Sequence, residues 1–554
     1  MQHLFINKLK LYVLVFSFIA KAANAEDLTI QNECAEKGSV PRPDRFDHIS
    51  VNIQPIFDED NPKENTWLFR LVNDLHINTR EKVIKDDLLF KEGDIYNEKL
   101  LEQSERILRK RRYLNYAAVT SLEKCQLTNQ VNVDVREVWT LVPAVNFSHA
   151  GGNSNYSFGL RDSNFLGLGK TLNFKHTNSI ERTGDSFQYY DPNTGKLNST
   201  INLQYEKNSD GIVKSAAIIR PFQELETEWT SGISYSEYTQ ESTLYNAGKE
   251  VNRYAHAGLN ESIFYGFKIN TESNELTHRF IFGYDRLKEN FLSVGEPPNT
   301  SILVPDNREF NYPWIEYQQI TDNYVKAYNI QQINRVEDIN FGDSFRFRLG
   351  YSSSPIDTFD GSYVFEGDYE KAISLSKKQL IITNVNALGY YNTGEFYNTR
   401  IQANIAYHWQ NFDRGQFYIG LNSTRGFHLF NNLPLEIGGD TGLRGYPSRY
   451  QAGDHLRLIT IEQRYFGERE WFSLFHMGAA VFYDEGRVWG ESAIPQSQTS
   501  VLRDVGIGLR ISGTRTGNRE EGAHNILHLD IAYPLDGGAD ISKFQWIVKV
   551  KKGF

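Results

Sequence analysis

The 554-residue sequence lacks the features that mark helical membrane proteins and most metalloproteins. Beyond its N-terminal end, no stretch approaches the roughly 18 consecutive apolar residues of a spanning helix, and the mean hydropathy is −0.50. Two cysteines exclude a disulfide-dense scaffold and a multi-cysteine zinc or iron–sulfur site. The formal net charge of −10 argues against a nucleic-acid-binding protein, whose affinity depends on contacts with phosphates.

Motifs of known catalytic sites are also missing. The sequence contains neither H-E-x-x-H nor G-x-S-x-G. Gly169-Lys170-Thr171 is like the end of a phosphate-binding loop, but Asn164 occupies the position of that motif's first glycine. A tight turn between two strands is the better interpretation. We therefore expect no enzymatic activity, no cofactor and no metal site.

The N-terminus has the pattern of a secretory signal peptide. Lys8 and Lys10 flank the start of an apolar run that extends to Ala20, and Ala23-Asn24-Ala25 is a small-x-small cleavage site. The alternative is a short N-terminal anchor. We expect residues 1–25 to be removed, leaving an extended leader at residues 26–45.

Export places the two cysteines in an oxidising compartment. Cys34 and Cys125 are therefore expected to form a disulfide. The alternative is a pair of free, buried thiols.

Residues 46–140 have the pattern of one small mixed domain. Alternation predicts a strand around Ile49–Ile53, and helix-start signals occur at Asn78 and Asn97. Two further strands are predicted at 116–122 and 131–138, which makes the element order β-α-α-β-β. Arg109–Arg112 crowd the end of the second helix, where cations suit the helix dipole. A solvated helix end is the favoured interpretation of this basic run, and a binding patch is the alternative.

From residue 141 to 554 the sequence has the period of β-strands. Tyr 31, Phe 35 and Gly 42 are high counts, and apolar residues such as Ile401, Ala403 and Ile405 alternate with polar ones. The segments are about 10 residues long, as tilted membrane strands require. A soluble sandwich also alternates, but export and aromatic segment ends favour the membrane. The sequence therefore predicts an all-β transmembrane barrel of about 16 antiparallel strands, with a long loop at 290–312.

Three motifs go beyond barrel composition. They are FGLRDSNFLGLGKTL at 158–172, GGDTGLRGY at 438–446 and FYDEGRVW at 482–489. With these residues the chain resembles the BamA/TamA superfamily of outer-membrane assembly factors, also called the bacterial surface antigen family. The β-α-α-β-β unit resembles its periplasmic POTRA domain. The best-known members carry several POTRA domains, whereas residues 46–140 have room for one, so a short, single-POTRA member is expected.

The resemblance implies a role for one arginine. The motif Gly442, Leu443, Arg444, Gly445 and Tyr446 matches a loop that folds into the barrel lumen in this superfamily, where the arginine pairs with carboxylates on the barrel wall. The matching carboxylates here are Glu462 and Asp484. An arginine fork suits carboxylates in a bidentate arrangement. The alternative is an exposed turn arginine with a solvated partner.

The chain ends in a strand that resembles the C-terminal recognition signal of outer-membrane proteins. Trp546, Val548, Val550 and Phe554 share one parity and are expected to face lipid. Lys552 interrupts this apolar parity.

The favoured function is assembly or translocation of proteins at the bacterial outer membrane. A POTRA domain in the periplasm would capture client polypeptides by β-augmentation, and the barrel, surrounded by outer-membrane lipid, would insert or export them. The alternative is a passive, porin-like channel with the POTRA domain as a periplasmic foot, and lipid handling also stays open. The sequence names neither the client nor any accessory subunit.

Overall fold

The computed structural model describes residues 45–121, 130–143, 146–195, 198–269, 275–294, 304–353, 360–497, 499–516, 519–520, 523–538 and 541–554. The predicted signal peptide, almost all of the leader, Cys34 and Cys125 lie outside these residues. The cleavage site and the disulfide therefore stay predictions. In the described part of the chain, no helix has the length and apolarity needed to cross a membrane.

The N-terminal domain packs helices against a three-stranded sheet of order β1-β3-β2. Its elements are β1 His48–Gln54, α2 Trp67–Leu75, α3 Glu81–Asp86, α4 Glu98–Lys110, β2 Leu114–Ser121 and β3 Gln130–Glu137. Val131, Val133 and Val135 of the central strand are fully buried in the core, as their alternation with polar residues predicts. The order predicted from sequence is present, with α2 as an additional helix between β1 and α3.

The two helix starts show where local signals hold and where tertiary contacts override them. Asn97 caps α4 as predicted, its side chain accepting a hydrogen bond from the Lys99 N–H at 3.1 Å. The start predicted at Asn78 is wrong, because Arg80 is the N-cap of α3. The Arg80 N–H instead donates to the Gly167 carbonyl at 3.0 Å, which holds this segment against a barrel turn.

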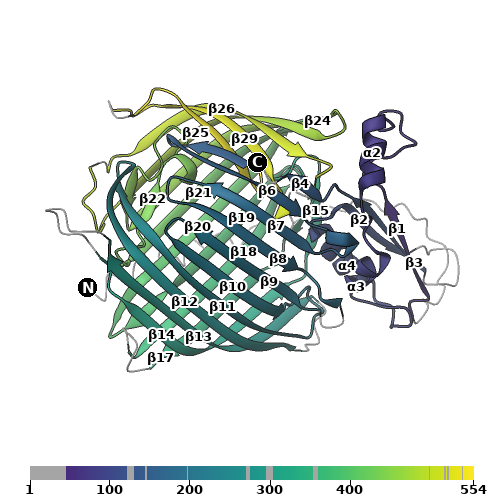
Figure 1. Cartoon of the computed structure of the whole chain (residues 1–554), viewed down its shortest axis with the longest axis horizontal. Coiled ribbons are helices and arrows are strands. Elements are labelled where there is room, and N and C mark those ends of the chain that lie inside the picture. Colours follow the sequence, from purple (N-terminus) through teal and green to yellow (C-terminus); the bar gives the residue numbers. More distant parts are fainter. Residues whose placement is uncertain are drawn as a thin grey trace.

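The remainder of the chain closes into an antiparallel barrel (Figure 1). Its strands are β4 Leu141–Pro143, β5 Asn146–Ala150, β6 Asn153–Asp162, β7 Thr171–Asn178, β8 Thr183–Asp191, β9 Thr200–Asn208, β10 Gly211–Arg220, β11 Trp229–Asn246, β12 Lys249–Ile269, β13 Leu276–Ser293, β14 Arg308–Thr321, β17 Ser344–Ser352, β18 Ser362–Ser376, β19 Gln379–Asn392, β20 Glu395–Phe412, β21 Gly415–Phe427, β24 His455–Trp471, β25 Phe475–Trp489, β26 Leu502–Gly513, β29 Ile526–Pro534 and β30 Gln545–Lys551.

The barrel has more strands than the sequence predicts. β4 and β5 both pair with β6 and form the two halves of one strand, so the described part of the chain contains a 20-stranded barrel. The estimate of about 16 assumed long strands and loops throughout. Several strands are short instead: β7 has 8 residues and β8 has 9. The loop predicted at 290–312 is also shorter, because β13 extends to Ser293 and β14 begins at Arg308.

Side chains alternate between the lumen and the outside of the barrel. On β25, Phe482 and Asp484 are buried inside, whereas Val481 between Ala480 and Phe482 is exposed outside. Apolar side chains exposed on other strands, such as Ile233, Ile263 and Ile507, belong to the same outer surface. An apolar outer surface around a polar interior is the arrangement of a barrel that spans a lipid bilayer.

A closed barrel pairs its backbone groups around the whole circumference, so it resists detergent until it is heated. We therefore expect the protein to migrate differently on a gel before and after boiling. Identical migration of both samples, with the protein recovered in a soluble fraction, would contradict a membrane barrel.

The barrel is closed more weakly at one place than elsewhere. β30 pairs with β29 along seven consecutive residues, but its register with β5 on the other side contains one pair, Val548 with His149. The His149 ring also stacks on Trp546 with 3.7 Å between centroids. Among the described residues, the junction between the first and last strands is thus a seam with little backbone pairing.

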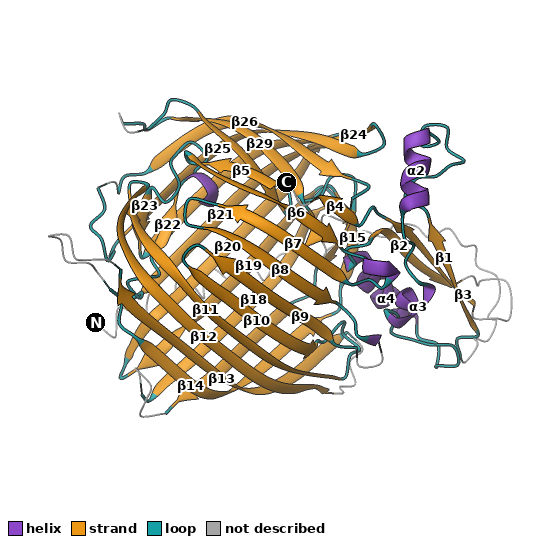
Figure 2. Cartoon of the chain, viewed as in Figure 1, coloured by secondary structure: helices purple, strands orange, loops and turns teal. Residues whose placement is uncertain are grey.

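Three short hairpins are not part of the barrel wall. They are β15 Tyr324–Tyr328 with β16 Val336–Asn340, β22 Leu435–Ile437 with β23 Gln451–Gly453, and β27 Arg519–Glu520 with β28 Ala523–His524. The N-terminal domain covers one end of the barrel, and β15 lies at that end, next to α4 (Figure 2). We call this the domain end.

Candidate functional site

The segment between β21 and β24 folds into the barrel from the end opposite the domain. Gly442 has φ 135°, a conformation that favours glycine, and a Cβ there would lie 2.2 Å from Leu458. A Cβ on Gly445 would lie 2.7 Å from the Cβ of Asp504. The two glycines therefore let the backbone turn tightly against the barrel wall.

The turn places Arg444 between carboxylates of two barrel strands. Its Nε donates to Asp484 Oδ2 at 2.7 Å and its Nη2 to Asp484 Oδ1 at 2.9 Å, a bidentate pair. Its Nη1 donates to Glu462 Oε1 at 2.9 Å. The guanidinium also stacks over Phe482, 3.4 Å from the ring centroid. All these groups are buried, so the arginine and its partners form an ion cluster withdrawn from water.

The other motif residues hold the loop against the wall. Leu443 is fully buried in an apolar cluster with Ile437 and Val488. The Gly445 N–H donates to Asp504 Oδ2 at 3.0 Å, and the Tyr446 hydroxyl donates to the Arg503 carbonyl at 2.8 Å. Backbone, apolar and charged contacts therefore fix the same short segment.

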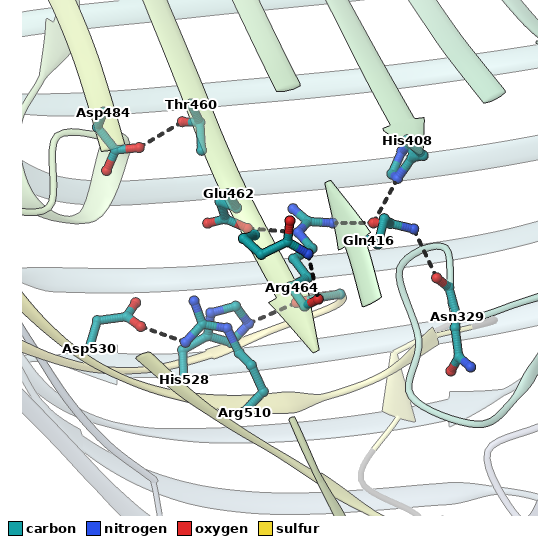
Figure 3. A network of polar contacts seen from close by, with 12 residues as sticks. Asn329, His408, Gln416, Thr460, Glu462, Arg464, Asp484, Arg510, His528 and Asp530 are labelled. Carbon is teal, nitrogen blue, oxygen red and sulfur yellow. Dashed lines mark hydrogen bonds and ion pairs between the residues drawn. The ribbon is translucent and has the colours of Figure 1, made fainter. Parts of the chain in front are cut away.

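The ion cluster continues along the lumen wall through residues that the sequence analysis missed (Figure 3). Arg464 Nε donates to Glu462 Oε2 at 2.7 Å, and Arg510 Nη1 donates to Asp530 Oδ1 at 2.5 Å. The spacing of these charged residues along the sequence could have identified them. Glu462 and Arg464 are two residues apart on one strand, so they face the same side, and charged residues at lumenal parity indicate such a network.

A cavity of about 400 Å³ lies beside this network. Arg444, Glu462 and Arg464 line it, together with Lys549, Lys551 and Phe554 of the chain's C-terminal end. The lumen is therefore partly filled by the loop, the charged wall and the C-terminal residues.

The last residues of the chain lie inside the barrel. The Phe554 ring lies 4.7 Å from that of Phe466, and its N–H donates to the Gln331 carbonyl at 2.8 Å. The prediction that Phe554 faces lipid is thus wrong, because β30 ends at Lys551 and the chain then turns inward, where His528 Nε2 bonds the Gly553 carbonyl at 2.8 Å.

Other residues of the predicted C-terminal signal are placed as expected. Trp546 is exposed on the outer face. Val548 and Val550 share its parity, opposite to the buried Ile547. Whether these residues act as a recognition signal stays a prediction.

A long hairpin enters the lumen from the domain end. We call residues 322–343, which contain β15 and β16, the strap. Its tip reaches the lumenal wall, where Gln416 Nε2 donates to the Asn329 carbonyl at 2.9 Å. It also reaches the C-terminal residues, because Gln332 Nε2 donates to the Lys552 carbonyl at 2.5 Å and Ile333 is fully buried against Phe466 and Phe554. The strap joins two neighbouring wall strands, β14 and β17, so this connection is much longer than a tight turn.

The strap is also bound to the N-terminal domain. Arg109 of α4 donates to Asp338 at 2.6 and 3.0 Å, and Lys326 Nζ donates to Glu105 Oε1 at 2.6 Å. Burial raises the pKa of Glu105, whereas the hydrogen bonds from Lys326 and from the Val119 N–H lower it. Together the lowering effects are larger, so the pKa of Glu105 lies below its ordinary value. This carboxylate is therefore ionised at neutral pH and attracts Lys326.

The basic end of α4 forms ion pairs with other parts of the same chain and is not simply a solvated helix end. Besides Arg109, Lys110 pairs with Glu224 in the turn after β10 at 2.9 Å, and Arg106 pairs with the same carboxylate at 3.2 Å. Arg111 bonds Asp87 within the domain at 2.5 Å. The favoured interpretation of the run was wrong, because acids on the barrel rim, distant in sequence, neutralise these cations.

The motif at 158–172 provides a second contact between domain and barrel. It contains the end of β6, a turn and the start of β7, as the sequence predicts. In the turn, Asn164 Nδ2 donates to Thr79 Oγ1 at 2.9 Å, while its Oδ1 accepts from the Gly169 N–H at 2.7 Å. The Thr79 N–H in turn donates to the buried Glu137 at 2.5 Å. Asn164 thus shapes the turn and joins it to the domain.

A family model agrees with the fold of the N-terminal domain. Residues 74–138 match the family model described as "POTRA: Surface antigen variable number repeat". No curated protein matches the sequence. Among solved structures, BamA from Haemophilus ducreyi lacking POTRA domains 1-3 is similar at 14% identity and a TM-score of 0.37, over 91% of this chain and 84% of that one. CdiB from Escherichia coli is similar at 12% identity and a TM-score of 0.47, over 93% and 77%.

The fold and the family match define the class of protein. The chain is a closed antiparallel β-barrel with an N-terminal domain of the POTRA type. This is the combination that its resemblance to the BamA/TamA superfamily implies.

Proposed function

We propose that the protein is a BamA/TamA-type factor of the bacterial outer membrane that inserts or exports polypeptides. The POTRA domain lies in the periplasm and captures clients, and the barrel receives them. The observation that carries this proposal is the seam, where the first and last strands share one register pair, Val548 with His149. A strand edge with so little pairing offers backbone groups to an incoming strand.

The POTRA sheet supports the same role. Its order β1-β3-β2 places β1 and β2 at the two edges in the described part of the domain. An extended client segment can add to such an edge through main-chain hydrogen bonds. A passive channel needs neither a sheet edge nor a weak seam.

Locking the seam tests the proposal. In a variant without Cys34 and Cys125, we expect a disulfide between His149→Cys and Val548→Cys to block client handling, because the strands can no longer separate. The readout is quantitative proteomics of the outer-membrane fraction in cells that express the locked protein alone. One or more outer-membrane or exported proteins should fall in abundance and recover when a reductant opens the disulfide.

The matched control places the disulfide on the other side of the same strand. Leu527→Cys with Val550→Cys joins β29 to β30, which are already paired along their length, so it should leave the proteome unchanged. Equal proteomes for the seam lock and this control, with both disulfides formed, would overturn a role for the seam.

A further inference from the structure

Helix α2 is an addition to the β-α-α-β-β unit and packs on the domain by one side alone. Its Thr66 cap accepts a hydrogen bond from the Phe69 N–H at 3.3 Å. The Phe69 ring stacks on Phe57 with 4.0 Å between centroids, and Asn73 Nδ2 donates to the Phe57 carbonyl at 2.9 Å. Phe69 and Asn73 are four residues apart and define the packed face of the helix.

The opposite face of α2 is apolar and exposed. At about 100° per residue, Leu71 projects away from Phe69 and Asn73, with Trp67 and Leu75 on the same stripe. Trp67 is 70% exposed, Leu71 42% and Leu75 64%, and no residue of this helix is buried. A helix normally packs its apolar stripe against the core of its own protein. Because this stripe is exposed, we expect it to contact something outside the domain.

A buried arginine fixes the base of α2 to the barrel rim. Arg515 Nη2 donates to Glu64 Oε1 at 2.9 Å and its Nη1 to the Ile56 carbonyl at 3.0 Å, both in the segment between β1 and α2. Its Nε donates to the Ser473 carbonyl at 3.2 Å, in the turn between β24 and β25. The helix is therefore anchored at the end of the barrel wall.

That turn carries exposed aromatic residues of its own. Phe472 is 73% exposed, and Trp471 and Leu474 beside it are also exposed. Aromatic residues at strand ends form the girdle of a membrane barrel at the lipid interface. In Figure 2, α2 lies just beyond the end of β24 and runs across the barrel axis, which is the direction of the membrane plane. The helix thus lies beside the turn that carries these exposed aromatic residues.

We infer that α2 is a membrane-contact helix whose apolar stripe enters the interface of the adjacent bilayer leaflet. This inference rests on the proposed placement of the barrel in the outer membrane. The stripe lies on one convex helix, which suits a lipid surface better than a peptide that needs a groove. Trp67 is also a residue favoured at lipid interfaces. The contact would hold the POTRA domain close to the membrane beside β24–β26.

Fluorescence quenching in a bilayer tests this directly. The full-length protein, with Cys34 and Cys125 replaced by serine, carries a bimane label at Leu71→Cys and is reconstituted into phosphatidylethanolamine–phosphatidylglycerol vesicles. We expect lipids brominated near the top of the acyl chain to quench about half of the fluorescence, as for a helix lying in the interface. The control is the same label at Lys82→Cys, an exposed position on α3, which should stay unquenched.

Quenching by aqueous iodide distinguishes a stripe that is open to water from one that is covered by protein. If the label at position 71 is not quenched by brominated lipid, the inference is overturned: iodide quenching then shows a stripe open to water, and protection from iodide shows cover by protein, such as the leader or a client. A Leu71→Glu variant should reduce lipid quenching of a label at Trp67→Cys severalfold. Heat-modifiable migration shows that the barrel is folded, and flotation of the protein with the vesicles shows that it is inserted. Failure of the helix contact is therefore distinguishable from failure of the membrane placement.

Discussion

Replacing Arg444 by alanine is expected to lower the free energy of unfolding of the barrel by roughly 3–5 kcal/mol. The alanine leaves the buried Asp484 without its bidentate partner, and the cost of an unpaired buried charge exceeds the worth of the pair itself. Lysine at 444 should recover part of the loss, because it keeps the charge but not the fork. The measurement is the urea midpoint of the heat-modifiable form in vesicles.

The two carboxylates should respond unequally to this substitution. Glu462 keeps a hydrogen bond from Arg464 at 2.7 Å when Arg444 is removed, whereas Asp484 keeps one from the Thr460 hydroxyl at 2.9 Å. Asp484→Asn should therefore partly rescue Arg444→Ala, and Glu462→Gln should rescue it less. A double-mutant cycle measures both couplings.

Arg449→Ala is the matched control on the same loop. Arg449 is about a third exposed, and its pairs are with the partly exposed Glu181 and Glu436. Its removal should cost no more than about 1 kcal/mol. If Arg444→Ala has the same midpoint as Arg449→Ala, the loop is not held by its arginine, and the resemblance loses its most specific support.

Removing the strap is expected to raise the conductance of the barrel severalfold. The Phe341 N–H donates to the Asn323 carbonyl at 2.8 Å, so the ends of the strap are adjacent and residues 324–340 can be replaced by a two-residue Asn-Gly turn. The deletion frees the lumen wall at Gln416 and releases the C-terminal residues from Gln331. Planar-bilayer recording of single channels gives the measurement.

A second variant separates the tip of the strap from its contact with the domain. Lys326→Gln with Asp338→Asn removes the ion pairs to α4 but leaves the tip in the lumen, so its conductance should stay close to that of the unchanged protein. If the deletion and the unchanged protein conduct equally, the strap does not close the barrel. A large, stable conductance in the unchanged protein would instead favour the passive channel.

Local pattern predicted much of the architecture. Alternation at Val131, Val133 and Val135 depends on a single strand facing one core, and the same holds for the barrel wall, where each inward residue is two positions from the next. Asn97 predicted its helix start because a cap needs no distant partner. The pairing of Arg444 with Glu462 and Asp484, by contrast, was available through resemblance and not through periodicity.

Ion pairs between residues far apart in the sequence could not be predicted from local pattern. Glu105 lies one helical turn from Arg109 and pairs with it, but nothing nearby in sequence shows that Arg109 and Lys110 contact the barrel end. Their partners there, Asp338 and Glu224, lie more than 100 positions away. The strap has ordinary hairpin composition, and its insertion into the lumen depends on contacts with Gln416 and the C-terminal residues. The predicted number of strands was wrong for a related reason, because strand and turn lengths vary around the barrel.

A β-barrel preceded by a small α+β domain could be predicted from the alternation of apolar and polar residues along short segments. Which charges meet, where Phe554 lies and which junction between strands is weakly paired became visible in the folded chain. These depend on barrel closure, which brings residues from opposite ends of the chain together at distances that sequence spacing does not encode. The inward turn after Lys551 is the clearest case: its apolar parity predicts lipid, but hydrogen bonds from His528 and Gln332 direct it into the lumen.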